Sequence, residues 1–276
     1  MRRLLVLAAA LGATALGFAC SSSGPKSGFT DGQNDATADG TSGGVGDGAP
    51  DDAFVPGFGD TSASDAGADC SPNLTGVLRD FHDTHPDFEK FLGDDRGIVQ
   101  NDLGADGKPV YAPATTSPTT TGKADFDQWY RDVPGTNFRM LFTVPLTPID
   151  GGVSSYDNPA FFPLDNQGFG NEGRDHNFHF TFELHTTFIY KGGEVFTFIG
   201  DDDVFAFVND KLAIDLGGVH GAETASVDLD ARAADFGIQK GQTYPLDVFQ
   251  AERHTTESHF RIDTSIEFTN CTPILR

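Results

Sequence analysis

Three consecutive aspartates, Asp201 to Asp203, stand between two apolar segments of the sequence. Neighbouring carboxylates repel one another, so a turn between two strands gains no stability from carrying them. A hard cation turns this repulsion into attraction, because Ca²⁺ takes roughly six to eight oxygen ligands and accepts clustered carboxylates and carbonyls. The run therefore predicts a calcium site. The alternative is an acidic turn that is simply exposed to solvent.

A glycine-rich stretch downstream, residues 215–221, places His220 on a loop. Glycine allows positive φ angles and a close approach of the backbone to its neighbours. We expect His220 either to flank a ligand site beside the aspartates or to form hydrogen bonds within its own loop.

Three further candidates, Glu252, Arg253 and His254, follow an apolar segment. These residues could line the rim of the same site. Alternatively, Arg253 pairs internally with an aspartate, because a buried acidic site requires charge balance. Both alternatives stay open on the sequence alone.

One other polar row, formed by His179, Glu183 and His185, lies opposite a row of phenylalanines. Imidazole and carboxylate groups are suitable zinc ligands. Along a strand, however, the outer two of these residues are separated by about 20 Å, which one ion cannot bridge. We therefore expect an exposed polar face rather than a metal site.

The sequence lacks the common motifs of hydrolases, zinc proteases and phosphate-binding loops. Three adjacent aspartates on one loop also do not provide the two facing carboxylates that glycoside hydrolysis requires. We therefore predict that the protein is not an enzyme.

The segments that position these residues alternate between apolar and polar side chains, which is typical of β-strands. Residues 260–268 and 178–188 each place apolar side chains on one face. Further strands are predicted over residues 194–199, 204–209, 211–216 and 244–251, and short helices around residues 86–92 and 229–236. Asn209-Asp210 is a suitable two-residue hairpin turn. The pattern predicts an all-β fold, an antiparallel sandwich or barrel with short helices and long loops.

The N-terminal region predicts export. Residues 1–19 combine an arginine pair with an apolar run that is too short to span a bilayer, which is typical of a signal peptide. Cys20 and the serines after it resemble a bacterial lipoprotein signal, in which the cysteine is lipidated; an ordinary cleaved signal is the alternative. Residues 20–69 are rich in Gly, Ser, Thr and Asp and predict a disordered, flexible tether. The folded domain is then expected over residues 70–276.

Charge and cysteine content narrow the choice of partners and compartment. The chain has 41 acidic and 18 basic residues and a formal net charge of −23, which argues against nucleic acid as a partner. Cys70 and Cys271 bracket the folded region. In an oxidising compartment we expect them to form a disulfide, with two free thiols as the alternative.

The stretch GDDDVFAFVN, residues 200–209, resembles the signature of PA14 domains. More closely, the chain resembles the fibro-slime domain of secreted slime-mould and myxobacterial surface proteins. This resemblance covers most of the chain, in a fixed order of short motifs. They are LTGVLRDF (74–81), THPDFE (84–89), FDQWY (126–130) with NF (137–138), YDNPAFFPLD (156–165), DLGGVHG (215–221), FQAERH (249–254) and SHF (258–260).

The resemblance implies a PA14-like β-sandwich. In its carbohydrate-binding members, two aspartates joined by a cis peptide hold a Ca²⁺ ion that itself contacts sugar hydroxyls, and Asp201 and Asp202 match those two positions. Another loop, matching residues 252–258 here, completes the site in those members. Asp203 stands where many PA14 domains have glycine. We expect Asp203, with His220, Glu252, Arg253 and His254, to surround the ligand.

Together these features predict a surface-anchored, calcium-dependent adhesion module that binds an extracellular glycan or matrix polysaccharide. Its contact with the membrane would be the lipid on Cys20 alone, and the absence of aspartate after that cysteine favours the outer membrane or cell surface. A structural surface protein with a purely structural calcium ion is the main alternative. An enzyme that acts on polysaccharide is the third.

Overall fold

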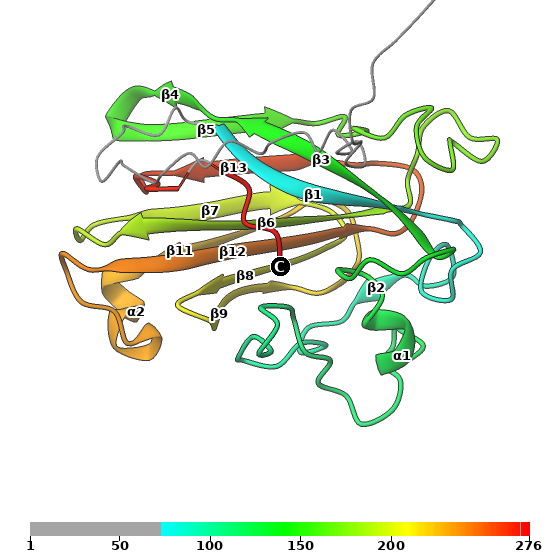
Figure 1. Ribbon diagram of the computed structural model, residues 1–276, viewed down its shortest axis with the longest axis horizontal. Helices are drawn as coiled ribbons and strands as arrows, with labels where there is room; N and C mark the ends of the chain where they lie inside the picture. The colour runs from blue at the N-terminus through cyan, green and yellow to red at the C-terminus, as the bar shows by residue number, and fades with distance from the viewer. Residues whose placement is uncertain (1–72, 271) are drawn as a thin grey trace, which may run out of the picture. The chain divides into compact units, whose positions relative to one another are not determined.

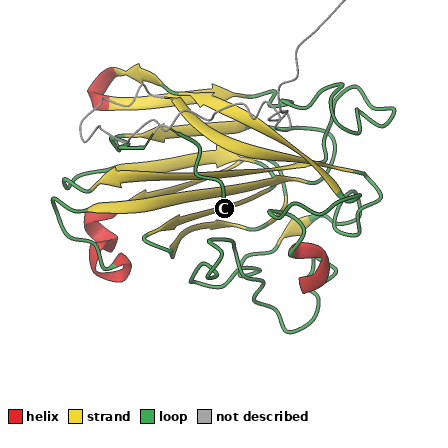
Figure 2. Cartoon of the chain, in the orientation of Figure 1, coloured by secondary structure: helices red, strands yellow, loops and turns green. Residues whose placement is uncertain are grey.

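The computed structural model describes residues 73–270 and 272–276. The predicted signal peptide at 1–19, lipidation at Cys20, tether at 20–69 and Cys70–Cys271 disulfide lie outside the described residues. The described part of the chain folds into two antiparallel β-sheets with long connecting loops (Figure 1; Figure 2). The predicted all-β antiparallel sandwich is confirmed.

The first sheet has six strands in the order β3-β1-β6-β12-β8-β9. Its members are β1 (Asn73–Phe81), β3 (Asn137–Pro145), β6 (Phe180–Ile189), β8 (Asp203–Val208), β9 (Lys211–Leu216) and β12 (Thr243–Glu252). The second sheet has five strands in the order β11-β7-β13-β5-β4. Its members are β4 (Thr147–Ile149), β5 (Val153–Asn158), β7 (Val195–Gly200), β11 (Glu223–Asp228) and β13 (Phe260–Thr264). The remaining elements are the pair β2 (Gly93–Asp94) and β10 (Gly218–Val219), helices α1 (Lys123–Phe126) and α2 (Leu229–Phe236), and a 3-10 turn (Asp150–Gly152).

The main core lies between the two sheets. The alternating apolar residues of β6, β8 and β12 meet those of β7 and β13 there, and each fully buried phenylalanine contributes roughly 1.5–3 kcal/mol. The predicted phenylalanine row of β6 points into this core. Its members are Phe180, Phe182, Leu184 and Phe188.

A second core covers the opposite face of the first sheet. The connection between β1 and β3, residues 82–136, folds over this face, and we call it the covering segment (Figure 1). Apolar residues of the covering segment pack on outward-facing residues of β8 and β12. They are Ile98, Val99, Tyr111, Phe126, Trp129 and Tyr130 from the segment and Phe205, Phe207, Phe249 and Ala251 from the sheet. All six residues of β8 are consequently buried.

Most of the predicted elements are confirmed, with shifts at their ends. Helix α2 spans the predicted residues, because Asp228 caps its N-terminus and Gly237 ends it in the left-handed conformation with φ 66°. Asn209 and Asp210 form the predicted turn with φ 49° and 62°. The last strand is shorter than predicted and ends at Thr264. The helix predicted at 86–92 is wrong, because turns occupy this stretch, where Glu89 has a positive φ of 57°.

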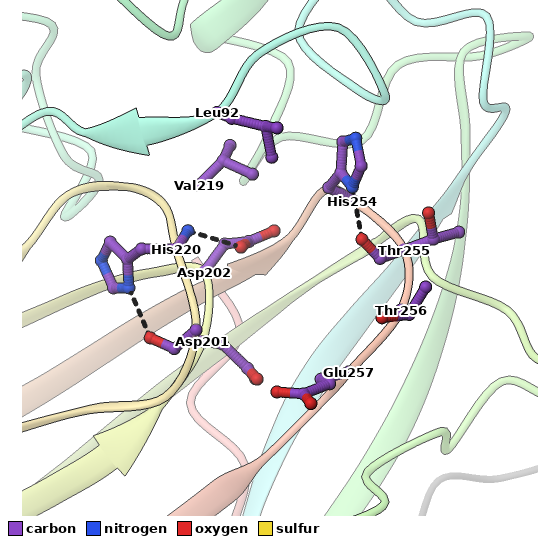
Figure 3. A pocket seen from close by; sticks show the side chains of 10 residues that line it. Leu92, Asp201, Asp202, Val219, His220, His254, Thr255, Thr256 and Glu257 are labelled. Atoms are coloured by element: carbon purple, nitrogen blue, oxygen red, sulfur yellow. Dashed lines mark hydrogen bonds between the residues drawn. The ribbon is translucent and has the colours of Figure 1, made fainter. Parts of the chain in front are cut away.

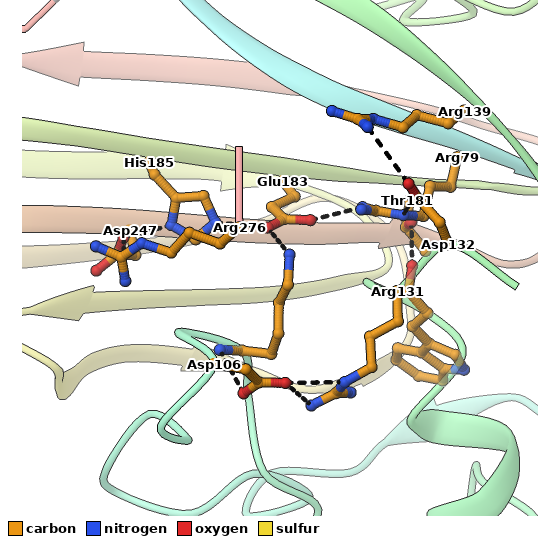
Figure 4. Close-up of polar contacts among 12 residues, drawn as sticks. Arg79, Asp106, Arg131, Asp132, Arg139, Thr181, Glu183, His185, Asp247 and Arg276 are labelled. Carbon is orange, nitrogen blue, oxygen red and sulfur yellow. Dashed lines mark hydrogen bonds and ion pairs between the residues drawn. The ribbon is translucent and has the colours of Figure 1, made fainter. Parts of the chain in front are cut away.

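The expectation that His179, Glu183 and His185 form an exposed face is also wrong. All three are buried, because the covering segment lies over them. Glu183 accepts hydrogen bonds from Arg79 Nη1 at 2.6 Å, from Lys108 Nζ and from His185 (Figure 4). His185 Nδ1 in turn lies 2.5 Å from an oxygen of Asp247. Lys108 belongs to the covering segment, so this buried network ties the segment to the sheet.

Within residues 73–270 and 272–276, none of the helices has the length and apolar character needed to cross a membrane.

Candidate functional site

Two crossings between the sheets meet at the acidic run. The chain leaves β7 at Gly200 and enters β8 at Asp203, and it leaves β12 at Glu252 and enters β13 at Phe260. Gly200 pairs with Phe260 in one sheet and Asp203 pairs with Ala251 in the other. These pairings hold the two crossings side by side. Glycine is required at 200, because a Cβ there would lie 2.6 Å from the carbonyl oxygen of His259.

A small pocket of about 160 Å³ opens between these crossings, and we call it the acidic pocket (Figure 3). Its walls come from the acidic run, from the loop after β12, and from the glycine-rich loop around β10. The lining residues are Leu92, Asp201, Asp202, Val219, His220, Gly221, His254, Thr255, Thr256 and Glu257. The structure therefore brings together the predicted residues Asp201, Asp202, His220 and His254.

Backbone amides hold the first two aspartates in place. Asp202 accepts hydrogen bonds from the N–H groups of His220 and Arg253, one on each carboxylate oxygen and both at 3.0 Å. Asp201 Oδ1 accepts the N–H of His259 at 2.5 Å. Asp201 Oδ2 is buried and has no hydrogen-bond partner among the described residues. The acidic run thus keeps one free carboxylate oxygen at this site.

Asp203 and Arg253 form a fully buried ion pair and do not line the acidic pocket. Arg253 Nε donates to Asp203 Oδ2 at 2.6 Å, and the N–H of Gly218 donates to Asp203 Oδ1 at 2.7 Å. The Arg253 guanidinium also donates to the carbonyl of Thr119 at 2.7 Å and lies 4.6 Å from the ring centre of Trp129. The alternative that Arg253 pairs internally with an aspartate is confirmed. Because Arg253 also bonds to Thr119 of the covering segment, this ion pair anchors the segment beneath the site.

Glu252 ends β12 immediately before Arg253 and is fully buried. Its carboxylate oxygens have no hydrogen bond of normal geometry within the described part of the chain, although the Ser258 side chain lies close enough to favour the charged form. Burial raises the pKa of Glu252 well above its usual value, and the nearby charges of Asp202 and Asp201 raise it further. Burial likewise raises the pKa of Asp202 and of Asp201. The carboxylates of Asp201, Asp202 and Glu252 therefore resist being charged together, although the charge of Arg253 partly offsets this for Asp202.

The two histidines at the pocket make local contacts. His220 Nδ1 lies 3.0 Å from the carbonyl of Gly221, and its Nε2 lies 3.2 Å from the carbonyl of Leu216. The alternative that His220 bonds within its own loop is confirmed, although His220 also lines the pocket. His254 Nδ1 contacts the carbonyl of Thr255.

Sequence reasoning missed Glu89 and Leu92. Glu89 clamps the loop after β12, because its N–H donates to the carbonyl of Arg253 at 2.9 Å and its carboxylate accepts the N–H of Thr255 at 3.2 Å. Leu92 is 75% exposed at the pocket edge. Glu89 ends the motif at 84–89 and Leu92 lies just after it. That motif supported the family resemblance but gave no indication of what either residue does.

In the carbohydrate-binding members that the chain resembles, the matching aspartates are joined by a cis peptide, but the peptide between Asp201 and Asp202 is trans. In the described parts of the chain, the one cis peptide joins Thr255 to Thr256. Across the same residues, no group of three or more His, Cys, Asp or Glu side chains is placed so that it could hold a metal ion by itself. A cation here would therefore need main-chain carbonyls or water in addition to side chains.

Comparison with known proteins supports a PA14-like family. The sequence profile of the PA14 domain matches residues 151–275. Three proteins of Dictyostelium discoideum are similar: protein psiQ is 43% identical over 189 residues, protein psiR 41% over 202 and protein psiD 42% over 187. These matches cover 63%, 67% and 63% of this chain, which is more than the PA14 profile covers. The chain spans only 19%, 20% and 36% of the length of these relatives.

Two solved structures are also similar to this chain, although their sequence identity to it is low. They are the PA14 domain of the MpAFP antifreeze protein, at 9% identity, and a PA14 sugar-binding domain from an RTX adhesin, at 10% identity. The first match covers 73% of this chain and 84% of that one, and the second covers 71% and 95%. Both have a TM-score of 0.29. The profile match and the relatives thus support a PA14-like family for this region.

Proposed function

We propose that the folded region is an adhesion module that binds an extracellular glycan or matrix polysaccharide through Ca²⁺ at the acidic pocket, with Asp201 and Asp202 as metal ligands. The observation that carries the proposal is the buried, unpartnered oxygen of Asp201 at the pocket. A buried carboxylate oxygen without a partner is costly, and a hard cation removes that cost. The PA14 profile supports the same role, since PA14 domains serve as sugar-binding and adhesion modules.

The residues present fit Ca²⁺ in chemistry. Oxygen is the only ligand atom that this ion requires, and the pocket offers carboxylates, threonine hydroxyls and main-chain carbonyls. When bound, the ion would supply positive charge for sugar hydroxyls. Asp202 would hold the two pocket walls together, because its oxygens accept N–H groups from both the His220 loop and the Arg253 loop.

The test combines thermal unfolding with glycan retention. We expect Ca²⁺ to raise the Tm of the wild-type protein above its value in chelator, since a ligand that binds only the folded state stabilises it. Asp201→Asn should remove this rise and also glycan retention on an array. Unchanged values for both in the variant would contradict the proposal.

A structural calcium site without a glycan pocket is the second candidate. The observation that favours it is the tie that Asp202 makes between two loops, which a cation would reinforce. It predicts the same rise of Tm with Ca²⁺ but no retention on any glycan, so the array separates the two candidates.

We further propose export and lipid anchoring, with a signal peptide at 1–19, a lipid on Cys20 and a tether over 20–69. The supporting features are in the sequence alone. Cys20→Ala in the full chain should release the protein from the membrane fraction. Continued sedimentation of that variant with membranes would contradict the anchor.

A further inference from the structure

One strip at the edge of the sandwich has no acidic residue of its own. Strand β3 is an outer strand of the first sheet, and the single residue Leu146 connects it to β4, an outer strand of the second (Figure 1). Residues 137–149, which we call the edge strip, contain no aspartate or glutamate, although the whole chain has 41 acidic residues. Their one charged residue is Arg139, and Asp132 beside it is already paired with Arg79 and Arg139. The negative charge of the chain is therefore not carried by the edge strip.

The edge strip also exposes large apolar side chains. Phe138 is 50% exposed, Leu141 56% and Ile149 49%. Phe138 and Leu141 lie on opposite faces of β3, because successive residues of a strand alternate between its faces. A strand that pairs with β3 would cover part of both side chains, whereas a partner that packs on one face would cover only one of them.

Strand β3 lacks the features that protect the other outer strands. β4 has three residues and contains Pro148, and β11 has an acid at each end, Glu223 and Asp228. The pairing of β9 with β8 has a register shift, and the covering segment forms backbone bonds with β9. Short length, proline, charges and bulges prevent unwanted strand pairing. In contrast, β3 has nine residues in unbroken register with β1, with proline only at its last position, and no described strand pairs with its outer side.

The sequence of β3 is compatible with pairing to a second copy of itself. In an antiparallel pair with a two-fold axis at Leu141, residues at equal distance from Leu141 lie opposite one another. Leu141 then faces Leu141 of the second copy, Met140 faces Phe142, and Arg139 faces Thr143. Apolar pairs across two strands stabilise a sheet, and like charges directly opposite destabilise it. This arrangement has apolar pairs and no facing like charges.

We propose that two copies of the chain associate through their β3 strands, in antiparallel orientation about a two-fold axis at Leu141. The six-stranded sheets of the two copies then form one continuous sheet, held by backbone hydrogen bonds along β3. The contact also covers part of Phe138 and Leu141. This self-association does not depend on the proposed calcium pocket.

The pairing leaves both acidic pockets accessible. Strands β1, β6 and β12 lie between β3 and β8. Phe138, near the start of β3, pairs with Asp80, and both Asp80 and Glu252 pair with Phe180. The acidic pocket is therefore at the end of the sheet where β3 begins. Because the two β3 strands run in opposite directions, the two pockets lie at opposite ends of the pair. This consequence rests on the proposed function: a glycan-binding pair of this kind cross-links two polysaccharide chains.

The experiment measures self-association of the full chain by sedimentation equilibrium in chelator. All proteins carry Cys20→Ala, so that the predicted lipid does not hold them in the membrane fraction. We expect dimers with Leu141 present at concentrations below about 100 μM. Leu141→Lys and Leu141→Glu should each weaken the dimer at least about tenfold, because each places like charges opposite one another at the axis. The control is Val195→Lys, which adds a charge at an exposed apolar side chain of the second sheet and should change self-association less than about twofold.

A mixture of the two charge variants tests the position of the axis. Chains with Leu141→Lys and chains with Leu141→Glu should form mixed dimers, because opposite charges then face one another. We expect the affinity of the mixed pair to return to within about tenfold of that of the dimer with Leu141. An interface elsewhere on the chain would not be restored by mixing. Because Leu141 is more than half exposed, both variants should unfold at the same urea concentration as the control.

The outcomes are distinguishable from those of the calcium experiment. A chain that stays single up to about 100 μM would overturn the proposal, as it would if another segment of the same chain paired with β3. A dimer that the charge variants leave unchanged, or that their mixture does not restore, would also overturn it. Each of these results leaves the calcium pocket standing. A chain that forms the expected dimer but binds no Ca²⁺ would keep the self-association and overturn only the pocket.

Discussion

Two buried polar clusters on neighbouring strands of one sheet differ in their charge balance. Beneath the covering segment, Glu183 has Arg79, Lys108 and His185 around it. At the end of β12, Glu252 has no basic side chain bonded to it among the described residues, and at the acidic pocket Asp201 has one oxygen without a partner. In the first cluster three basic side chains surround one acid. In the second, among the described residues, Arg253 is the only basic side chain bonded to an acid, and it pairs with Asp203.

The pKa values follow this difference. Burial opposes the charged form of Glu183 as well, but the hydrogen bond from His185 and the charges of Arg79 and Lys108 lower its pKa to about 2. Burial raises the pKa of Glu252, and its acidic neighbours raise it further. A buried acid with its own partners serves the fold, and a buried acid without them indicates a binding site. The following predictions test this distinction.

The largest effect is expected from Glu183→Gln. This change leaves Lys108 buried without a carboxylate and removes one of the two carboxylates of Arg79, which keeps Asp132. Breaking a buried ion pair on one side typically costs about 3–5 kcal/mol. Urea unfolding in chelator measures the loss. The matched comparison is E252Q, which we expect to be as stable as the wild type or more so under the same conditions. If both variants lose equal stability, the distinction between the clusters fails.

The next effect is expected from Asp203→Asn. Arg253 is then buried without its acidic partner, and we expect a loss of about 3 kcal/mol in the free energy of unfolding. The loss should be the same with Ca²⁺ and with chelator, because Asp203 is assigned to the internal pair. A loss that appears only in Ca²⁺ would instead place Asp203 among the metal ligands.

A smaller effect is expected in the pH dependence of the free energy of unfolding. The carboxylates of Asp247 and Glu183 outweigh burial and raise the pKa of His185 above its usual 6.5. A raised pKa of a histidine gives stability that is fully present below the unfolded-state value and is lost as the pH rises through the folded-state value. Wild-type stability should therefore fall as the pH rises above 6.5, and His185→Gln should flatten this fall.

This pH series is best measured from pH 7 upward. Burial raises the pKa of Asp80 to about 6, although hydrogen bonds from Asn177 and Phe169 oppose this rise. Asp80 has therefore lost most of its proton by pH 7, and its effect on the pH dependence of stability lies mainly below that pH. Chemical unfolding in chelator at each pH supplies the free energies. Equal slopes for the wild type and the His185 variant would contradict the assignment.

The smallest effect is expected from Leu92→Ser at the pocket edge. Because Leu92 is 75% exposed, stability should change by less than about 0.5 kcal/mol. Glycan retention should fall modestly, since Leu92 borders the pocket. Chemical unfolding and the glycan array measure the two quantities. A large loss of stability would show that Leu92 packs more than its exposure indicates.

Local patterns in the sequence were sufficient to predict most of the strands, one helix and part of the candidate site. Alternation of apolar residues predicted the strands on both sides of Asp201, and the Asn209-Asp210 turn and helix α2 followed from local preferences. The acidic run was recognised as the connection between two strands, but that it crosses from one sheet to the other came from the structure. Such patterns depend only on neighbours along the chain, so they need no knowledge of the tertiary fold.

Only the tertiary structure decided what lies on each face. The strand period places Glu183 and His185 together on one face. It does not reveal that the covering segment lies over them, with Lys108 bonded to Glu183 from 75 positions away in the sequence. The pairing of Asp203 with Arg253 spans 50 positions, and the isolation of Glu252 depends on every element around it. The charges around a buried acid come from residues that are far apart in the sequence, so a pattern among neighbouring residues cannot predict whether that acid is neutralised.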